Sequence, residues 1–202
     1  MEKILTTYLA GFIEASPEQA FNWREDAYKA LYVPDKLLVY DPIRQEAFKT
    51  GKETGSHVKY VIGLKKAGKW KKFQEEMDKI WLGNIKPTVD LGRLFELLKD
   101  RAMIDGNKEH ELKLWGDFEA VARSDFIIAY MKKDIQTVGT IGEIFEAMLL
   151  KIPVYLIIDS PKTETNSTLL YWVMYSGGEI FYKLDDCIKF IKEKYKLKQK
   201  EK

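Results

Sequence analysis

The chain alternates short apolar runs with amphipathic stretches, and this alternation restricts its fold more than any other feature. Residues 4–11, 36–42, 125–130 and 152–158 are short apolar runs of the kind that form buried strands. Alternating strands and helices are typical of an α/β domain with a mostly parallel sheet and helices on both faces. We therefore predict one domain over residues 1–202, with a sheet of about five strands.

The expected helices lie between these strands. Ser16 is a predicted N-cap with Pro17 at the first helical position, and this helix runs to about Leu31. Further elements are expected in the C-terminal half: helices over 143–150, 167–176 and 185–195, and a short strand over 179–184.

Residues 45–107 break this rhythm. The region is rich in lysine and shows two helical patterns, over 69–82 and 90–103, separated by the sequence GNIKPT. We interpret it as an inserted helical lobe. Residues 108–124 are expected to form one helix, despite Gly116, that leads into the strand at 125–130.

Composition excludes several classes of protein. Hydrophobic residues make up 46% of the chain, and no apolar run reaches the roughly 18 residues that span a bilayer. No signal-peptide pattern is present, and the single cysteine, Cys187, fits a reducing cytoplasm. The formal net charge is only +2, and the basic tail at 192–202 is interpreted as a solvated end rather than a nucleic-acid arm.

Common catalytic signatures are also missing. The sequence has no GxxxxGK[ST] phosphate loop and no GxGxxG after the first strand. With one cysteine and two histidines, His57 and His110, neither a transition-metal site nor histidine-dependent nucleophilic catalysis is expected. Carboxylates, tyrosines and hydroxyls are left to perform chemistry.

Glu143 has two interpretations. Thr140 and Glu143 match the T-x-x-E capping box, in which the glutamate bonds back to a backbone N–H. Alternatively, Glu143 is a nucleophile, because a carboxylate near a helix N-terminus at the carboxyl edge of a parallel sheet is held ionised in a ligand-binding position.

Other candidates carry similar alternatives. Asp117 is either a solvated helix residue or a catalytic acid, and Asp125 is expected to hold the turn into the strand that follows it. Tyr8, on the first strand, is either a core residue or the group that orients a carboxylate.

Three motifs together resemble the nucleoside 2-deoxyribosyltransferase family and the related nucleoside 5′-monophosphate N-glycosidases. They are YLAGFI from Tyr8, DFEAVARSD from Asp117, and VGTIGEIFEA, which contains Glu143 26 residues after Asp117. The resemblance implies a flavodoxin-like fold and cleavage of an N-glycosidic bond by double displacement. In this scheme Glu143 attacks C1′, Asp117 exchanges a proton with the base, Tyr8 orients Glu143, and no metal or organic cofactor takes part.

The resemblance also implies the residues that bind substrate: Gly11, Phe12, Thr137, Gly139, Ser167 and Thr168. Thr137 stands where transferases for free nucleosides usually carry an aspartate, which favours a 5′-monophosphate, because a hydroxyl donates to phosphate and a carboxylate repels it. Phe12 suits stacking on a base, and Glu14 opposes a phosphate. Ser167 and Thr168 are by default the N-cap of the helix that follows. They also belong to a segment that reaches a neighbouring subunit's site in these families, so a homo-oligomer with shared active sites is expected.

Several alternatives remain open from the sequence. The enzyme is a transferase or a hydrolase, acting on a nucleoside or its monophosphate. A non-catalytic nucleotide-binding module on the same scaffold is the second class. A nucleic-acid-associated protein that uses the lysines of residues 65–72 is the least favoured, because such a run is usually the solvated face of a helix. No membrane partner is expected.

Overall fold

A parallel sheet forms the centre of the molecule. The computed structural model describes residues 3–13, 16–34, 36–45, 55–104, 112, 114–135 and 137–197. The five strands pair in the order β2-β1-β3-β4-β5, and every pairing is parallel. Their bounds are β1 Leu5–Gly11, β2 Leu37–Tyr40, β3 Phe126–Met131, β4 Val154–Ile158 and β5 Glu179–Phe181. This order is that of the flavodoxin-like fold, so the predicted fold class is confirmed.

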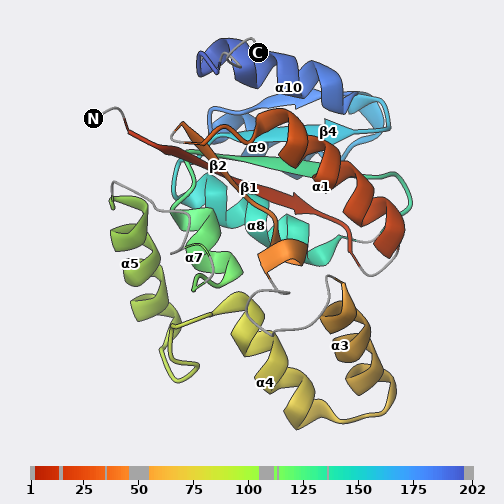
Figure 1. Ribbon diagram of the computed structural model, residues 1–202, viewed down its shortest axis with the longest axis vertical. Helices are drawn as coiled ribbons and strands as arrows, with labels where there is room; N and C mark the ends of the chain where they lie inside the picture. The colour runs from red at the N-terminus through yellow and green to blue at the C-terminus, as the bar shows by residue number, and fades with distance from the viewer. Residues whose placement is uncertain are drawn as a thin grey trace.

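Helices cover both faces of the sheet (Figure 1). On one face lie α1, Pro17–Leu31, and α10, Leu184–Lys194. On the other lie α7, Asp117–Ala122, α8, Val138–Leu149, and α9, Ser167–Tyr175, with a 3₁₀ turn at Lys162–Glu164 before α9. Ser16 occupies the predicted N-cap position of α1, although its side chain makes no capping hydrogen bond.

Alternation along the strands divides the core into two layers. Tyr8 and Ala10 point toward α7 and α8, whereas Leu9 points toward α1. Tyr8 is the direct neighbour of Tyr40 across the β1–β2 pair, and their rings stack with centroids 5.4 Å apart. Two tyrosines therefore stand side by side on the face that α7 and α8 cover.

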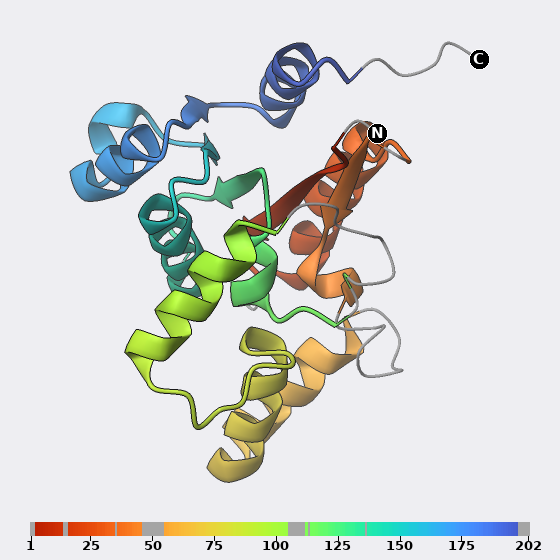
Figure 2. The ribbon, with the colours of Figure 1, turned by 90° about the vertical axis from the view of Figure 1, so that its left-hand side faces the viewer.

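The inserted region forms a helical lobe, in which the pair α3, Ser56–Lys66, and α4, Trp70–Trp81, lies beyond one end of the sheet and α5, Leu91–Ala102, packs beside α7 (Figures 1 and 2). Two of its helices match the predicted ones: α4, Trp70–Trp81, and α5, Leu91–Ala102. A third helix, α3, Ser56–Lys66, was not predicted. Its sequence contains Gly63 and several β-branched residues, which weaken the helical signal, and its packing against α4 stabilises it instead.

The prediction of one helix over 108–124 is wrong. Gly116 has an extended backbone and is the N-cap of α7, which begins at Asp117. Trp115 pairs with Gly83 of the lobe in an isolated β-bridge. A Cβ atom at Gly116 would lie 2.4 Å from the carbonyl oxygen of Trp81, so only glycine allows the two backbones to approach this closely.

Some predictions concern residues outside the described ranges. These are Glu14, His110, the basic residues at 198–202, and the borders of the lobe at 46–54 and 105–111. Across the ranges that the structure does describe, no helix combines the length and apolar character needed to cross a lipid bilayer.

Candidate active site

Tyr8 and Glu143 form a buried pair between β1 and α8. The Tyr8 hydroxyl donates to Oε1 of Glu143 over 2.5 Å, and both side chains are almost completely buried. Burial and the neighbouring carboxylates raise the pKa of Tyr8 well above its usual value, so the phenol keeps its proton and acts as the donor. The pair fixes one oxygen of the carboxylate.

The capping-box interpretation of Glu143 is wrong. The N-cap of α8 is Thr137, so the helix starts earlier than expected and Thr140 lies within its first turn. The carboxylate of Glu143 bonds to Tyr8 on a neighbouring element and does not cap the helix. The sequence spacing fitted a capping box, but the position of the helix start removes that role.

Burial also changes the chemistry of Glu143. Loss of solvent raises the pKa of Glu143 to about 7, although the hydrogen bond from Tyr8 and the charge of Arg24 both favour the ionised form. Its second oxygen, Oε2, is buried and has no hydrogen-bond partner among the described residues. A weakly hydrated carboxylate with one held and one unengaged oxygen is suited to nucleophilic attack.

Asp117 lies on the same side of the sheet as Glu143. It is the first residue of α7 and is buried. The hydroxyl of Tyr40 lies 3.0 Å from the carbonyl oxygen of Trp115 and 3.5 Å from Oδ1 of Asp117. The side chain of Tyr40, at the end of β2, therefore reaches the start of α7 and lies next to the Asp117 carboxylate.

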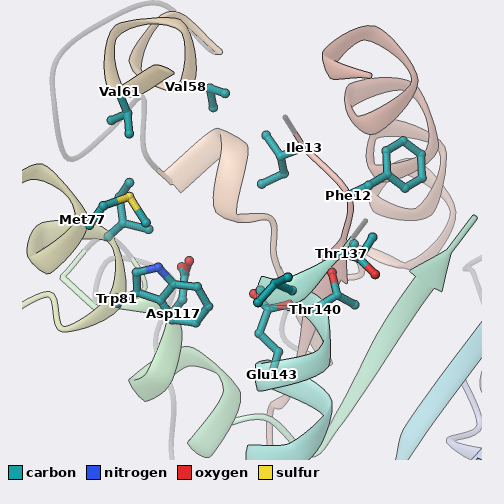
Figure 3. Close-up of a pocket in the computed structure, with 14 residues that line it drawn as sticks. Phe12, Ile13, Val58, Val61, Met77, Trp81, Asp117, Thr137, Thr140 and Glu143 are labelled. Atoms are coloured by element: carbon teal, nitrogen blue, oxygen red, sulfur yellow. The ribbon is translucent and has the colours of Figure 1, made fainter. Parts of the chain in front are cut away.

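Asp117 and Glu143 line one pocket of about 320 Å³ (Figure 3). A volume of this size suits a small-molecule site. The remaining lining residues come from three places: the end of β1 with the loop that follows it, the start of α8, and helices α3 and α4 of the lobe. They are Gly11, Phe12, Ile13, Val58, Val61, Met77, Ile80, Trp81, Thr137, Val138, Gly139 and Thr140.

Four of the six predicted substrate-binding residues line this pocket: Gly11, Phe12, Thr137 and Gly139. Thr137 is buried, and its Oγ1 has no hydrogen-bond partner among the described residues, although the residue is at the N-cap. The ring of Phe12 packs edge-on against Tyr130 in the core, with centroids 5.7 Å apart. Stacking of Phe12 on a base would require that ring to leave the core.

Ser167 and Thr168 do not line the pocket. Both are exposed at the start of α9, and the N-cap of this helix is Asn166, whose side chain accepts from the backbone N–H groups of Thr168 and Leu169. The two hydroxyls are therefore not part of this pocket within one chain.

Three buried residues near the site were not predicted from the sequence: Arg24, Tyr40 and Glu146. Arg24 donates to the carbonyl oxygens of Leu9, Gly11 and Phe12, and so fixes the loop that follows β1. Its guanidinium also lies 3.8 Å from the carboxylate of Asp41. Pairing of β2 with β1 brings Tyr40 to the site, and packing of α1 against β1 brings Arg24 there, and no local pattern shows either contact.

Glu146 lies one turn after Glu143 on α8. It is buried, and neither carboxylate oxygen has a hydrogen-bond partner among the described residues. Burial first, and then the charges of Glu143 and Asp117, raise its pKa well above the usual value, so its neutral form is favoured. The sequence signal was its i+3 spacing from Glu143, which places both on one helix face.

Other charged candidates lie away from the pocket. Asp125 was expected to hold the local turn into β3, but its carboxylate instead accepts from the backbone N–H of Thr6 on β1 over 2.8 Å and pairs with Lys3, so it ties the start of β3 to the neighbouring strand. Arg44, which follows β2 and was a candidate to supply charge for a phosphate, does not line the pocket and is engaged by Glu25 and Asp41. Within the described ranges, no group of three histidine, cysteine or acidic side chains is arranged to hold a metal ion.

No protein-family model matches the chain, and neither the curated proteins nor the solved structures contain a significant match. The resemblance of the three sequence motifs to a family therefore stays a prediction.

Proposed function

We propose that this protein cleaves the N-glycosidic bond of a deoxynucleoside or its 5′-monophosphate by double displacement, as a member of the family that its three motifs resemble. One observation carries the proposal. A buried carboxylate with a pKa near neutrality is held by a tyrosine and lines the same small pocket as a second buried carboxylate. Glycosidic bonds are commonly cleaved by a pair of carboxyl groups, one nucleophilic and one that exchanges a proton.

Each residue has one role in this proposal. The Oε2 atom of Glu143 attacks C1′ as the bond from C1′ to the base nitrogen breaks, and Asp117 gives a proton to the departing base. Tyr8 keeps Glu143 oriented throughout. A second base or a water molecule then attacks C1′, releases Glu143, and returns a proton to Asp117. The developing positive charge at the sugar is stabilised by the anionic glutamate.

The start of α8 supports a phosphorylated substrate. Thr137 offers a buried hydroxyl that no described residue engages, and Val138, Gly139 and Thr140, the first residues of α8, line the same pocket. The first backbone N–H groups of a helix have no partner within the helix and attract anions. We propose that a 5′-phosphate is bound here, with the sugar between Thr137 and Glu143.

Incubation with each deoxynucleoside and deoxynucleoside 5′-monophosphate, followed by chromatography, tests the proposal. Each substrate is offered with and without a second base. Release of free base without an acceptor identifies a hydrolase, and exchange of bases identifies a transferase. The Glu143→Ala variant should release no base while remaining folded. If the wild-type protein turns over none of these substrates but still binds nucleotides, it is a nucleotide-binding module.

The hydrolytic form is the second candidate, and Thr137 favours it. The resemblance places a hydroxyl at this position in the monophosphate N-glycosidases, which are hydrolases, and an aspartate in the transferases for free nucleosides. Cellular nucleotides would then be the substrates, in keeping with the cytoplasmic location that the single cysteine suggests.

A homo-oligomer is also part of the proposal. The outer faces of α8 and α9 expose several large apolar side chains, and the two helices are joined by contact of Phe145 with Trp172 at 5.0 Å. The exposed residues are Val138, Ile141, Phe145, Leu149, Tyr171, Met174 and Tyr175. Apolar faces of this extent are typical of protein interfaces, and a second copy here would cover the helix that carries Glu143.

A further inference from the structure

The lobe contributes a wholly apolar wall to the pocket. Of the described lining residues, Val58 and Val61 come from α3, and Met77, Ile80 and Trp81 come from α4. None of the five is charged, and the indole N–H of Trp81 is their one side-chain donor. This wall faces Thr137, Thr140 and Glu143 across the pocket, as Figure 3 shows.

The polar residues of the lobe lie elsewhere. Lys66, Lys69, Lys71 and Lys72 are exposed. His57 is buried, and its Nε2 lies 2.7 Å from Oε2 of Glu76, which ties α3 to α4. The lysines of the two helices therefore face solvent, the His57–Glu76 pair lies between the helices, and the surface toward the pocket is apolar. An apolar ligand that covers such a surface removes it from water, and this makes binding more favourable.

A ring contact and a close backbone approach at the end of α4 place this wall beside Asp117. The ring of Trp81 packs on Phe118, the residue after Asp117, with centroids 5.0 Å apart. The close approach of Gly83 to Gly116 joins the end of α4 to the start of α7. Trp81 is thus fixed next to the carboxylate proposed to protonate the departing base.

We propose that the wall formed by Val58, Val61, Met77, Ile80 and Trp81 is the subsite for the departing base, and that it selects bases carrying an alkyl substituent. The inference rests on the proposed function for the identity of the ligand as a nucleoside or nucleotide. The polar side of the pocket is assigned to the sugar and its 5′ group, so the base must face the lobe. The described wall residues offer it stacking and apolar contact rather than a set of hydrogen bonds to its edge.

Two series of ligands test the subsite. The first is deoxyuridine 5′-monophosphate with hydrogen, methyl, ethyl or propyl at position 5. The second is deoxyadenosine 5′-monophosphate with no, one or two methyl groups on N6. Binding is measured by calorimetry to the Glu143→Gln variant, which cannot turn over, and kcat/KM is measured with the wild-type protein. In at least one series, affinity should rise about fourfold for each added carbon.

Matched variants locate the effect. Trp81→Ala and Met77→Gln, each made in the Glu143→Gln background, should remove most of the gain from the alkyl group. Met77→Gln tests the wall even if Trp81→Ala fails to fold, because Met77 is only partly buried. Trp70→Ala is the control, since Trp70 lies on the same helix, does not line the pocket, and is 62% exposed. Trp70→Ala should keep the gain in affinity that the alkyl group provides.

The outcomes separate this inference from the proposed function. Cleavage of nucleotides with affinity that is flat or falling in both series would overturn the subsite and leave the enzyme intact. A gain from alkyl groups that survives both Trp81→Ala and Met77→Gln would also overturn it. A gain that these variants abolish, in a protein that cleaves no substrate, would support the subsite and refute the enzyme. No binding in either series would overturn the subsite, and the proposed function would then be decided by the turnover assay with every deoxynucleoside and deoxynucleotide.

Discussion

The hydroxyl of Tyr8 lies 2.5 Å from Oε1 of Glu143, and this contact joins the first strand to a helix 135 residues later in the chain. A distance this short is typical of a hydroxyl that donates to a carboxylate rather than to a neutral acceptor. It holds the carboxylate in one orientation and favours its ionised form, which the surrounding burial opposes. The pair therefore sets both the geometry and the charge of the proposed nucleophile.

Removing this hydroxyl should move the pH dependence of the reaction. In Tyr8→Phe, Glu143 loses a hydrogen bond that favours its ionised form, so its pKa should rise above the present value of about 7. A hydrogen bond to a charged group contributes about 1.5–3 kcal/mol, so the acid limb of kcat/KM should move up by roughly one to two pH units. The measurement is the pH–rate profile of both proteins with the best monophosphate substrate.

Tyr155→Phe is the matched control for this change. Tyr155 is a buried tyrosine on β4 whose hydroxyl lies 2.8 Å from that of Tyr195, in the core layer on the other side of the sheet. It should lower stability without moving the acid limb. An unchanged profile in Tyr8→Phe would show that Tyr8 does not control the charge of Glu143.

Glu143 should make stability depend on pH in a defined direction. Its pKa is raised in the folded protein to about 7, from an ordinary value of 4.5, so the folded state binds the extra proton between these values. Stability contributed by the neutral form is therefore present below about pH 4.5 and is lost as pH rises to about 7. The loss amounts to about 3 kcal/mol at pH 8.

Glu143→Gln removes this titration and keeps an oxygen for Tyr8. The variant should be more stable than the wild type at pH 8, by about 2–3 kcal/mol, and of similar stability at pH 5. Urea unfolding at both pH values measures the difference, and Glu164→Gln, at an exposed position, serves as control. An equal difference at both pH values would contradict the raised pKa.

Thr137 should decide the preference for a phosphorylated substrate. Thr137→Val removes the buried hydroxyl, and kcat/KM for the monophosphate should fall by about 10- to 100-fold while that for the nucleoside changes little. Thr137→Asp should reverse the preference, because a carboxylate repels the phosphate. Thr165→Val is the control, since Thr165 donates to Pro161 in an exposed turn. Parallel losses for both substrates would place Thr137 outside the phosphate site.

The exposed side of α9 should be needed for assembly. Met174 is 71% exposed on the apolar face shared by α8 and α9, and Met174→Glu would place a charge there at little cost to the isolated chain. Light scattering should show a dimer or larger assembly for the wild type and a smaller species for the variant. Met103→Glu, at an 82% exposed position just after α5, should leave assembly intact. A wild-type monomer would refute the oligomer and the roles of Ser167 and Thr168.

The strands were predictable because their apolar runs are short and bounded by polar residues. The helix that carries Glu143 was harder, since its first turns, VGTIGE, contain two glycines that weaken the helical signal. The predicted helix therefore began at Glu143, inside the actual helix, and Thr140 and Glu143 matched the spacing of a capping box. The true start at Val138 leaves Glu143 free of that role.

The rest of the site depends on contacts between distant segments. Tyr40 reaches Trp115 and the neighbourhood of Asp117 only because β2 pairs with β1, which local sequence does not specify. Arg24 fixes the loop after β1 from a helix that was predicted correctly, but its burial could not be predicted. The wall of the pocket required α3, the helix whose signal was weakest.

The contact between Gly83 and Gly116 yields the last prediction. Any Cβ atom at Gly116 would lie 2.4–2.5 Å from backbone atoms of Trp81, Leu82 and Gly83, so Gly116→Ala must separate the lobe from the start of α7. Asp117 is the next residue and Trp81 packs on Phe118, so the same displacement moves both the proposed acid and the apolar wall. We expect the free energy of unfolding to fall by about 1–3 kcal/mol, as for other overpacked sites. We also expect kcat to fall by more than the added fraction of unfolded protein would explain.

Gly63→Ala provides the comparison within the lobe: its Cβ would meet nothing within 4 Å, and alanine should stabilise the interior of α3 by roughly 0.5–1 kcal/mol. Thermal unfolding and kcat of the two variants measure the difference, and equal behaviour would mean that the lobe does not position Asp117.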